Sequence, residues 1–495
     1  MKRVSRVASL LFVLSATRAW GADIFVSPTG DDTAGGSIGT PLRTLPAALA
    51  RANPGDAIRL RAGSYPGGLL TKQATAAAPI RILSQDGPQL AILENSDEPL
   101  RVTASSWLVF DGLEVRNSIT NAVHIDTSHD LTLSNLFVHD AGLDGDVILI
   151  SQSQRIVIDS VEAARPGPRA GGQLPPFQPC IELIDVDDSV VRRSFIHDGG
   201  GSLLLIRGDS QNMVVERNVI GNQRDDGDAD PAVGLGGVTD VTLLHGAQFE
   251  VSTIVFRNNI VYTAAHGALA ISDAQHVAVA DNLFLNVDVV VVEFKAGGAP
   301  APGSDDVSFA NNLFVDTRGR MPAPFNRVTD TLTNFTAADD VYFNAGAPIP
   351  ASLGGVPADI NEPGRLTTDP GVAAPQAFTS RAQAIAALRP SPTGSAATPG
   401  LDVSGPPFNV TDDINGFGRN GRNDRGPYVL GSAGSGADLG TSGGGGSTGG
   451  GFGGGALPPR EGCACELGAT PFADVAPFAL VLLALLAGQL RRRRR

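Results

Sequence analysis

Residues 254–261 read IVFRNNIV, which combines alternating apolar residues, a polar corner with asparagine and a second apolar pair. Four segments repeat this pattern closely, at 131–138, 213–220, 277–284 and 307–314. Less regular copies lie at 107–115, 156–161 and 189–196. The shortest steps between successive corners are about 23 to 25 residues, and a unit that repeats at this length is typical of a solenoid.

The alternation within each copy predicts short strands with an apolar inner face. A leucine-rich repeat has a similar length, but it needs a regular leucine frame, whereas here the asparagine separates two apolar runs. We therefore predict an all-β fold, a parallel β-helix in which equivalent residues stack about 4.8 Å apart. The corner asparagines should form a ladder of amides, and we interpret them as structural rather than as a row of sugar ligands.

The two ends of such a stack expose unpaired strand edges that need covers. The pattern of 42–52 predicts one early helix, and we assign 22–76 to an N-terminal helical cap with the first strands. The turns of the β-helix then occupy 77–345. Beyond them the periodicity fades and Pro and Gly increase, so 346–430 is assigned to a loop-rich C-terminal closing segment with one short helix at 381–388.

Several segments are similar to a known family. Residues 25–30 (FVSPTG) and 61–65 (RAGSY) resemble the opening of pectate-lyase-like right-handed parallel β-helix proteins, and 107–115 (WLVFDGLEV) resembles their first clear turn. Residues 413–428 are similar to the closing segment of many secreted β-helix proteins. The resemblance implies a right-handed coil. It does not imply one activity, because this architecture serves lyases, hydrolases, epimerases and proteins without catalysis.

The N-terminus has the pattern of a secretory signal peptide. Basic residues precede the apolar run 7–16, and small residues suit cleavage near Gly21, so we assign 1–21 to the signal peptide. The chain is therefore expected to be exported. Its body contains only Cys180, which excludes a disulfide framework there.

The C-terminal end has a Gly/Ser-rich linker at 431–461 and a tail at 462–495. The tail holds Cys463 and Cys465, an apolar run that predicts a transmembrane helix, and five arginines that place this end in the cytoplasm. A plain membrane anchor is one interpretation. The tail also resembles the MYXO-CTERM sorting signal of myxobacterial surface proteins. That resemblance implies processing by a sorting protease at one of the two cysteines, followed by attachment to the cell surface or outer membrane.

Charge and composition restrict the partner. The formal net charge is −14, which argues against nucleic acid and anionic lipid. We expect a polysaccharide or surface glycan, bound by a monomer. The chain has only 2 Trp and 4 Tyr, a small supply of rings for stacking on sugars, so a non-catalytic surface or adhesion protein that recognises another protein is kept as an alternative.

Insertions interrupt the repeats at 164–179 and 222–248, and inserted loops on a rigid scaffold commonly carry function. Four carboxylates fall close together in the second insertion, at Asp225, Asp226, Asp228 and Asp230. Calcium takes six to eight hard oxygen ligands, so this cluster is a candidate calcium site. The loop lacks the glutamate at the twelfth position of an EF-hand, and a solvated acidic loop is the alternative.

Lys295 lies in VEFKAGG, which resembles the Phe-Lys-x-Gly segment that carries the base of one calcium-dependent lyase group. The resemblance implies that Lys295 removes the proton next to a uronate carboxylate, with Arg207 and Arg257 as other candidates for the base. Any enzymatic activity is expected to be that of a pectate-type polysaccharide lyase on uronic-acid polymers. A polygalacturonase is disfavoured because the chain has no Arg-Ile-Lys segment.

Two histidines occur in the same short motif, His139 in FVHD and His197 in FIHD. We interpret both as hydrogen-bonded structural residues, and their positions could stack if they lie two turns apart. The leading hypothesis is an exported, surface-anchored β-helix that binds polysaccharide through an elongated face. The calcium-dependent lyase is its first rival.

Overall fold

A computed structural model describes residues 21–430, apart from 173–176, 226–229, 298–301 and 357–361. The segments predicted as linker and sorting tail, and the predicted signal peptide except Gly21, therefore lie outside the described residues. Asp226, Asp228, Cys463 and Cys465 also lie outside them. No helix within the described ranges is long and apolar enough to cross a membrane.

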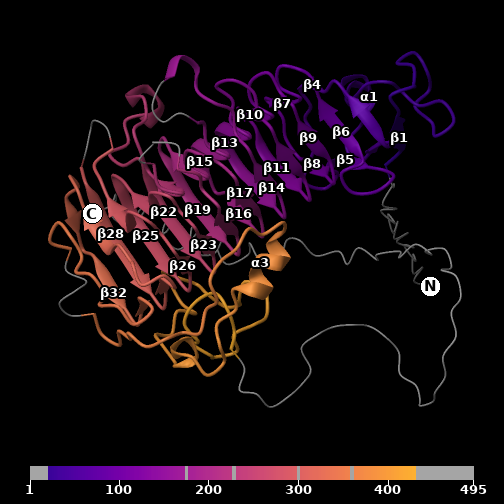
Figure 1. The fold of residues 1–495 in the computed structure, drawn as a ribbon. Coiled ribbons are helices and arrows are strands. Elements are labelled where there is room, and N and C mark those ends of the chain that lie inside the picture. The colour runs from indigo at the N-terminus through magenta and orange to yellow at the C-terminus, as the bar shows by residue number, and fades with distance from the viewer. Residues whose placement is uncertain (1–20, 173–176, 226–229, 298–301, 357–361, 431–495) are drawn as a thin grey trace, which may run out of the picture. The chain divides into compact units, whose positions relative to one another are not determined.

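The strands wind into a coil in which each turn contributes to three faces, which we call A, B and C (Figure 1). Strands of neighbouring turns pair in parallel, as β22 with β25 on face B and β24 with β27 on face A. Face C is an 11-stranded sheet, and faces A and B are joined through bent strands such as β13. The predicted parallel β-helix is confirmed.

Face A consists of β4 (Gly68–Leu70), β7 (Leu100–Thr103), β10 (Val123–Asp126), the first half of β13 (Ile148–Asp159), β15 (Ile181–Asp187), β18 (Leu204–Arg207), β21 (Val233–Leu235), β24 (Gly267–Ile271), β27 (Val290–Phe294) and β30 (Ala323–Arg327). Face B consists of β1 (Asp23–Val26), β2 (Ala57–Leu60), β5 (Ile80–Ser84), β8 (Leu108–Asp111), β11 (His129–Ser134), the second half of β13, β16 (Val190–Arg192), β19 (Ser210–Glu216), β22 (Val251–Arg257), β25 (Ala274–Ala280), β28 (Ser304–Ala310), β31 (Leu332–Thr333) and β32 (Thr336–Ala338). Face C consists of β3 (Gly63–Tyr65), β6 (Ala91–Glu94), β9 (Glu114–Arg116), β12 (Phe137–His139), β14 (Glu162–Ala164), β17 (Phe195–His197), β20 (Val219–Gly221), β23 (Ile260–Tyr262), β26 (Leu283–Leu285), β29 (Leu313–Val315) and β33 (Val341–Phe343).

The ladder of corner asparagines lies where face B turns into face C. Buried side-chain amides donate from one turn to the next, Asn218 to Asn259 at 3.1 Å, Asn259 to Asn282 at 3.1 Å and Asn282 to Asn312 at 3.0 Å. The row ends on the carboxylate of Asp340, which accepts from Asn312 at 3.0 Å. The predicted ladder is confirmed for these four residues.

Asn135 was predicted to belong to the same ladder, and that prediction is wrong. It occupies the preceding corner position, with a left-handed φ of 52°, and its exposed amide donates to Asp111. The apolar Leu136 fills the ladder position of this turn. Asparagine at a corner therefore has two roles. It either bonds in the buried amide ladder or, as one of the residues that tolerate left-handed backbone, occupies the exposed corner position before it.

The helix predicted at 42–52 is shorter in the structure, where α1 spans Leu45–Arg51. Thr44 is its N-cap, and its hydroxyl accepts from the backbone N–H of Ala47 at 3.3 Å. Leu42 instead lies in a parallel bridge with Val26, so it extends the first turn of the coil. Leu45, Ala48 and Leu49 are buried, and α1 contacts β1, β2 and β4 at the N-terminal end.

The closing segment, residues 346–430, folds back along faces B and C (Figure 1, orange to yellow). Its helix α3 spans Arg381–Ala387, close to the predicted 381–388. Phe378, Ile385 and Tyr428 pack on the apolar outer surface of face C around Leu283 and Leu313.

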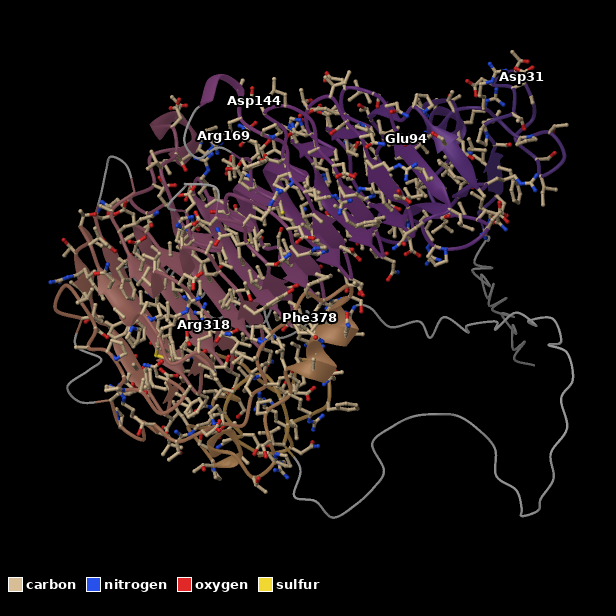
Figure 2. The ribbon with its side chains drawn as sticks, viewed as in Figure 1. Asp31, Glu94, Asp144, Arg169, Arg318 and Phe378 are labelled. Atoms are coloured by element: carbon tan, nitrogen blue, oxygen red, sulfur yellow. The ribbon has the colours of Figure 1, made fainter. Side chains whose placement is uncertain are left out.

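On face B, Val403, Phe408 and Val410 of the closing segment pack on Ala278, Ala280 and Ala310. In Figure 1 the segment lies along the lower side of the coil, whereas β4, β7 and β10 of face A lie along the upper side. Figure 2 shows Phe378 beside α3 on that lower side, and Asp144 and Arg169 on the upper side. The closing segment thus covers faces B and C of the last turns.

Candidate functional site

Outward side chains of face A form two columns along the coil. Strand register aligns the first column across five turns, as Glu182, Leu205, Gly234, Ala270 and Glu293. Alternate residues of a strand point the same way. The residues two positions after the members of the first column therefore form a second outward column. That column contains Arg207 at the end of β18 and, just after β27, Lys295.

Lys295 lies beside two carboxylates. Its Nζ is 3.9 Å from Oδ1 of Asp230 and 3.8 Å from Oε2 of Glu293, and its side chain is 32% exposed. Face A therefore brings the predicted base next to one of the predicted metal ligands.

 Asp230 and Glu293 are 63 residues apart in the sequence, and the register of the coil brings both of them to the same ammonium group.

The described part of the acidic insertion does not assemble a calcium site. Asp225 is 79% exposed, with Oδ1 3.7 Å from Nε2 of His266, and Asp230 faces Lys295. Both carboxylates thus lie beside nitrogen groups that compete with a cation. Within the described residues there is no group of three or more His, Cys, Asp or Glu side chains that could hold a metal ion. Calcium therefore remains a prediction.

A second cluster on this side of the coil was not predicted as a unit. Arg207 donates from Nε to Oε1 of Glu182 at 2.7 Å and from its terminal nitrogen to the carbonyl of Val238. Asp146 is buried near Glu182, and its Oδ1 has no hydrogen-bond partner among the described residues. Burial, together with the negative charge of Glu182, raises the pKa of Asp146 well above its usual value, while Arg169 and Arg207 oppose the shift.

No sequence motif could reveal this cluster, because the insertion at 164–179 separates Asp146 from Glu182. The pairing of β13 with β15 brings the two turns together. The chemical consequence is that Asp146 holds a proton at pH values where an ordinary aspartate is ionised, next to a carboxylate that is held by Arg207.

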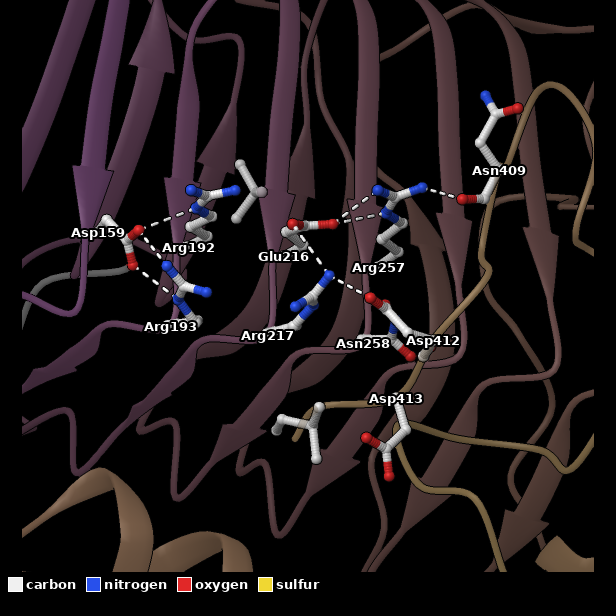
Figure 3. A network of polar contacts seen from close by, with 12 residues as sticks. Asp159, Arg192, Arg193, Glu216, Arg217, Arg257, Asn258, Asn409, Asp412 and Asp413 are labelled. Atoms are coloured by element: carbon white, nitrogen blue, oxygen red, sulfur yellow. Dashed lines mark hydrogen bonds and ion pairs between the residues drawn. The ribbon is translucent and has the colours of Figure 1, made fainter. Parts of the chain in front are cut away.

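Arg257 lies elsewhere, on face B under the closing segment (Figure 3). Its guanidinium donates to Oε2 of Glu216, with Nε at 2.9 Å, and to the backbone carbonyls of Phe408 and Asn409. Next to it, Arg217 forms an ion pair with Asp412 of the closing segment. Arg257 therefore anchors the closing segment, and Arg207 is the arginine of the two that lies on face A.

The two recurring histidines lie on face C, two turns apart, with Ala164 between them. His139 contacts Asp140 at 2.7 Å and Glu114 at 3.2 Å, and His197 contacts Asp198 at 2.9 Å and Glu162 at 3.3 Å. Burial disfavours the charged form of His197, but the hydrogen bonds to its two carboxylates outweigh burial and raise its pKa. The interpretation as hydrogen-bonded histidines is confirmed.

Comparison with known proteins identifies the fold. Residues 121–314 match a family model described as "Right handed beta helix region". "Pectate lyase PEL9" of Emericella nidulans is 39% identical over 74 residues, which are 14% of this chain and 18% of that protein. The chain thus matches less than a fifth of the length of that relative.

Several solved structures are similar in fold. Pectate lyase Pel9A is 14% identical with a TM-score of 0.46, over 66% of this chain and 81% of that chain. An alginate lyase from Paenibacillus sp. is 17% identical with a TM-score of 0.40, over 68% and 98%. A GH136 lacto-N-biosidase from Eubacterium ramulus is 13% identical with a TM-score of 0.38, over 70% and 68%. The chain contains a right-handed parallel β-helix of the pectate-lyase-like kind.

Proposed function

We propose that this protein binds an extended polysaccharide along face A. The observation that supports this proposal is the division of the three faces, in which the closing segment packs on B and C while the two outward columns of A carry charged side chains beside the insertions. The first column places Glu182 and Glu293 four turns apart, roughly 19 Å at about 4.8 Å per turn, with Leu205, Gly234 and Ala270 between them. An extended polymer that lies along face A would therefore meet charged groups at both ends of this stretch. The similarity to a protein named as a pectate lyase supports the polysaccharide class.

The experiment is a binding titration of the purified protein against a panel of neutral and uronic-acid polysaccharides. Arg207→Gln and Lys295→Gln should each weaken binding about tenfold, because each removes a charged hydrogen-bond donor from face A. Arg389→Gln is the matched control, since Arg389 is an exposed arginine of the closing segment that donates to the carbonyl of Val429. Binding that is equal in all three variants would contradict the proposal.

A calcium-dependent polysaccharide lyase is the second candidate, supported by the 3.9 Å approach of Lys295 to Asp230 of the acidic insertion. In that reaction a base removes the proton next to the uronate carboxylate, and the glycosidic oxygen leaves as a double bond forms. A base must act as a neutral amine, whereas the two neighbouring carboxylates of Lys295 pair with an ammonium group. We therefore rank binding first.

Ultraviolet absorbance of unsaturated uronate products separates the two candidates. A calcium-dependent rise that is absent in Lys295→Gln would establish the lyase, and binding without such a rise would leave the binding function. If no polysaccharide binds, the remaining candidate is a surface protein that recognises another protein. Fractionation of cells, with and without Cys463→Ala and Cys465→Ala, tests the proposed export, sorting-protease processing and surface anchoring.

A further inference from the structure

A groove of about 680 Å³ runs along the corners between faces B and C, on a different edge of the coil from face A. Its lining includes one side chain from each of six successive turns, namely Arg59, Gln85, Asp111, Asn135, Ser160 and Arg193. At about 4.8 Å per turn these corners span roughly 24 Å. The groove is therefore long enough for a linear ligand that lies along the axis of the coil.

The start of α3 closes one end of this groove. Ser380, Arg381 and Ala382 complete the lining at the turn of Arg193. The next corner along the coil is Arg217, and Arg381 covers it by donating from Nε and Nη2 to its carbonyl at 2.9 and 2.7 Å. Figure 1 shows α3 at the lower edge of the coil, where it contacts β20. A linear ligand that follows the corners must end at α3.

The closed end is positively charged. Within the described residues Arg381 donates hydrogen bonds to the backbone carbonyls of Arg217 and Ile414. Burial, with the nearby charges of Arg193 and Arg217, lowers the pKa of Arg381 to about 10. Arg381 is half-buried, and the nearby carboxylate of Asp159 already accepts from Arg192 and Arg193, so an anion is favoured beside Arg381.

The walls of the groove favour a ligand that forms hydrogen bonds with side chains rather than with the backbone. Backbone N–H groups of the corners already donate to the next turn, as Gln89 to Gly112 at 2.6 Å, Asn135 to Asp159 at 3.1 Å and Ser160 to Arg192 at 3.0 Å. A peptide strand cannot pair with these donors. The exposed amides of Gln85, Gln89 and Asn135 both donate and accept, which suits a ligand rich in hydroxyl groups.

We propose that this corner groove is a second binding site, for the end of an acidic oligosaccharide. The terminal carboxylate lies against Arg381, and the sugar hydroxyls bond the amides of Gln89 and Asn135. The groove site does not depend on the function proposed for face A. Arg381, Gln89 and Asn135 form the groove site, whereas Arg207 and Lys295 belong to face A.

The test is calorimetric titration of the full protein with a galacturonate hexamer and, as the neutral probe, a glucose hexamer. The galacturonate hexamer should bind, and Arg381→Gln should weaken it about tenfold or more because a charged hydrogen bond is lost. Arg389→Gln, which changes an exposed arginine outside the groove, should bind as the parent does.

Arg381→Gln removes donors to the carbonyls of Arg217 and Ile414 and would loosen the closing segment, so a second test uses the exposed Gln89 and Asn135. Both have a left-handed φ, 61° and 52°, which alanine tolerates poorly, so the double variant is Gln89→Gly and Asn135→Gly. It should weaken the galacturonate hexamer about tenfold with no change in melting temperature. Unchanged affinity in the double variant would overturn the groove site. Equal affinity for both hexamers would overturn the acidic ligand, and loss of binding only in Lys295→Gln would place the hexamer on face A.

Discussion

The carboxylate of Asp281 lies 3.4 Å from the guanidinium of Arg419, where the closing segment covers a corner of the coil. Both side chains are buried, at 0% and 4% exposure, and neither carboxylate oxygen has a hydrogen-bond partner in the described residues. Burial raises the pKa of Asp281 to about 7 although Arg419 opposes the shift. The adjacent turns have Asn258 and Asn311 at the equivalent corner.

Asp281→Asn should therefore stabilise the protein at neutral pH. The pKa of Asp281 in the folded state lies above the usual aspartate value of 3.8, so the folded state binds more protons, and the parent loses stability as pH rises from about 4 to 7. The variant should match the parent near pH 4 and exceed it by up to about 4 kcal/mol above pH 7. Denaturant unfolding across this range measures the difference.

The exposed Asp402 of the closing segment supplies a control. Its hydrogen bonds with Ser404 lower its pKa, so Asp402→Asn should not change the pH dependence of stability between pH 4 and 7. If Asp281→Asn instead destabilises the protein at pH 8, the ion pair with Arg419 outweighs the burial of the carboxylate.

The ladder predicts a large loss of stability at one buried amide. Asn282 donates to the carbonyl of Phe256 at 2.9 Å and accepts from the backbone N–H of Asn259 at 2.8 Å. Asn282→Ala leaves both partners buried without a bond, so the free energy of unfolding should fall by more than about 2 kcal/mol. Asn135→Gly, at an exposed corner with a left-handed φ of 52°, should change it by less than about 0.5 kcal/mol, because glycine adopts this backbone without strain. Similar values for the two variants in denaturant unfolding would contradict the ladder.

The repeat made the coil predictable, because strand alternation and corner asparagines are local patterns. The shorter α1 and the position of Asn135 were not predicted correctly, since each depends on which neighbouring turn the residue meets. The cluster of Asp146 with Glu182 and the hydrogen bonds of Arg381 to the carbonyls of Arg217 and Ile414 depend on contacts between distant segments. Those contacts follow from insertions and from the path of the closing segment, for which the sequence has no periodic signal.

Arg257 anchors the closing segment, so replacing it should loosen that segment selectively. Arg257→Gln removes donors to Glu216 and to the carbonyls of Phe408 and Asn409. Limited proteolysis should then cut within the closing segment several-fold faster, while the coil resists cleavage. Arg155→Gln, at an exposed arginine of face B that pairs with Asp130, is the matched control and should leave the cleavage rate unchanged. Equal protection of parent and Arg257 variant would show that the apolar contacts alone hold the segment.

The carboxyl pair of face A predicts opposite effects for two conservative substitutions. Because the pKa of Asp146 is raised in the folded state, the parent loses stability as pH rises above the usual aspartate value of 3.8. Asp146→Asn removes this loss and should stabilise the protein at pH 8. Glu182→Gln removes the charged acceptor of Arg207 and should destabilise it by about 1.5 to 3 kcal/mol. Melting temperatures at pH 5 and pH 8 measure both effects. A change of the same sign in both variants at pH 8 would contradict a raised pKa of Asp146 beside a Glu182 that is paired with Arg207.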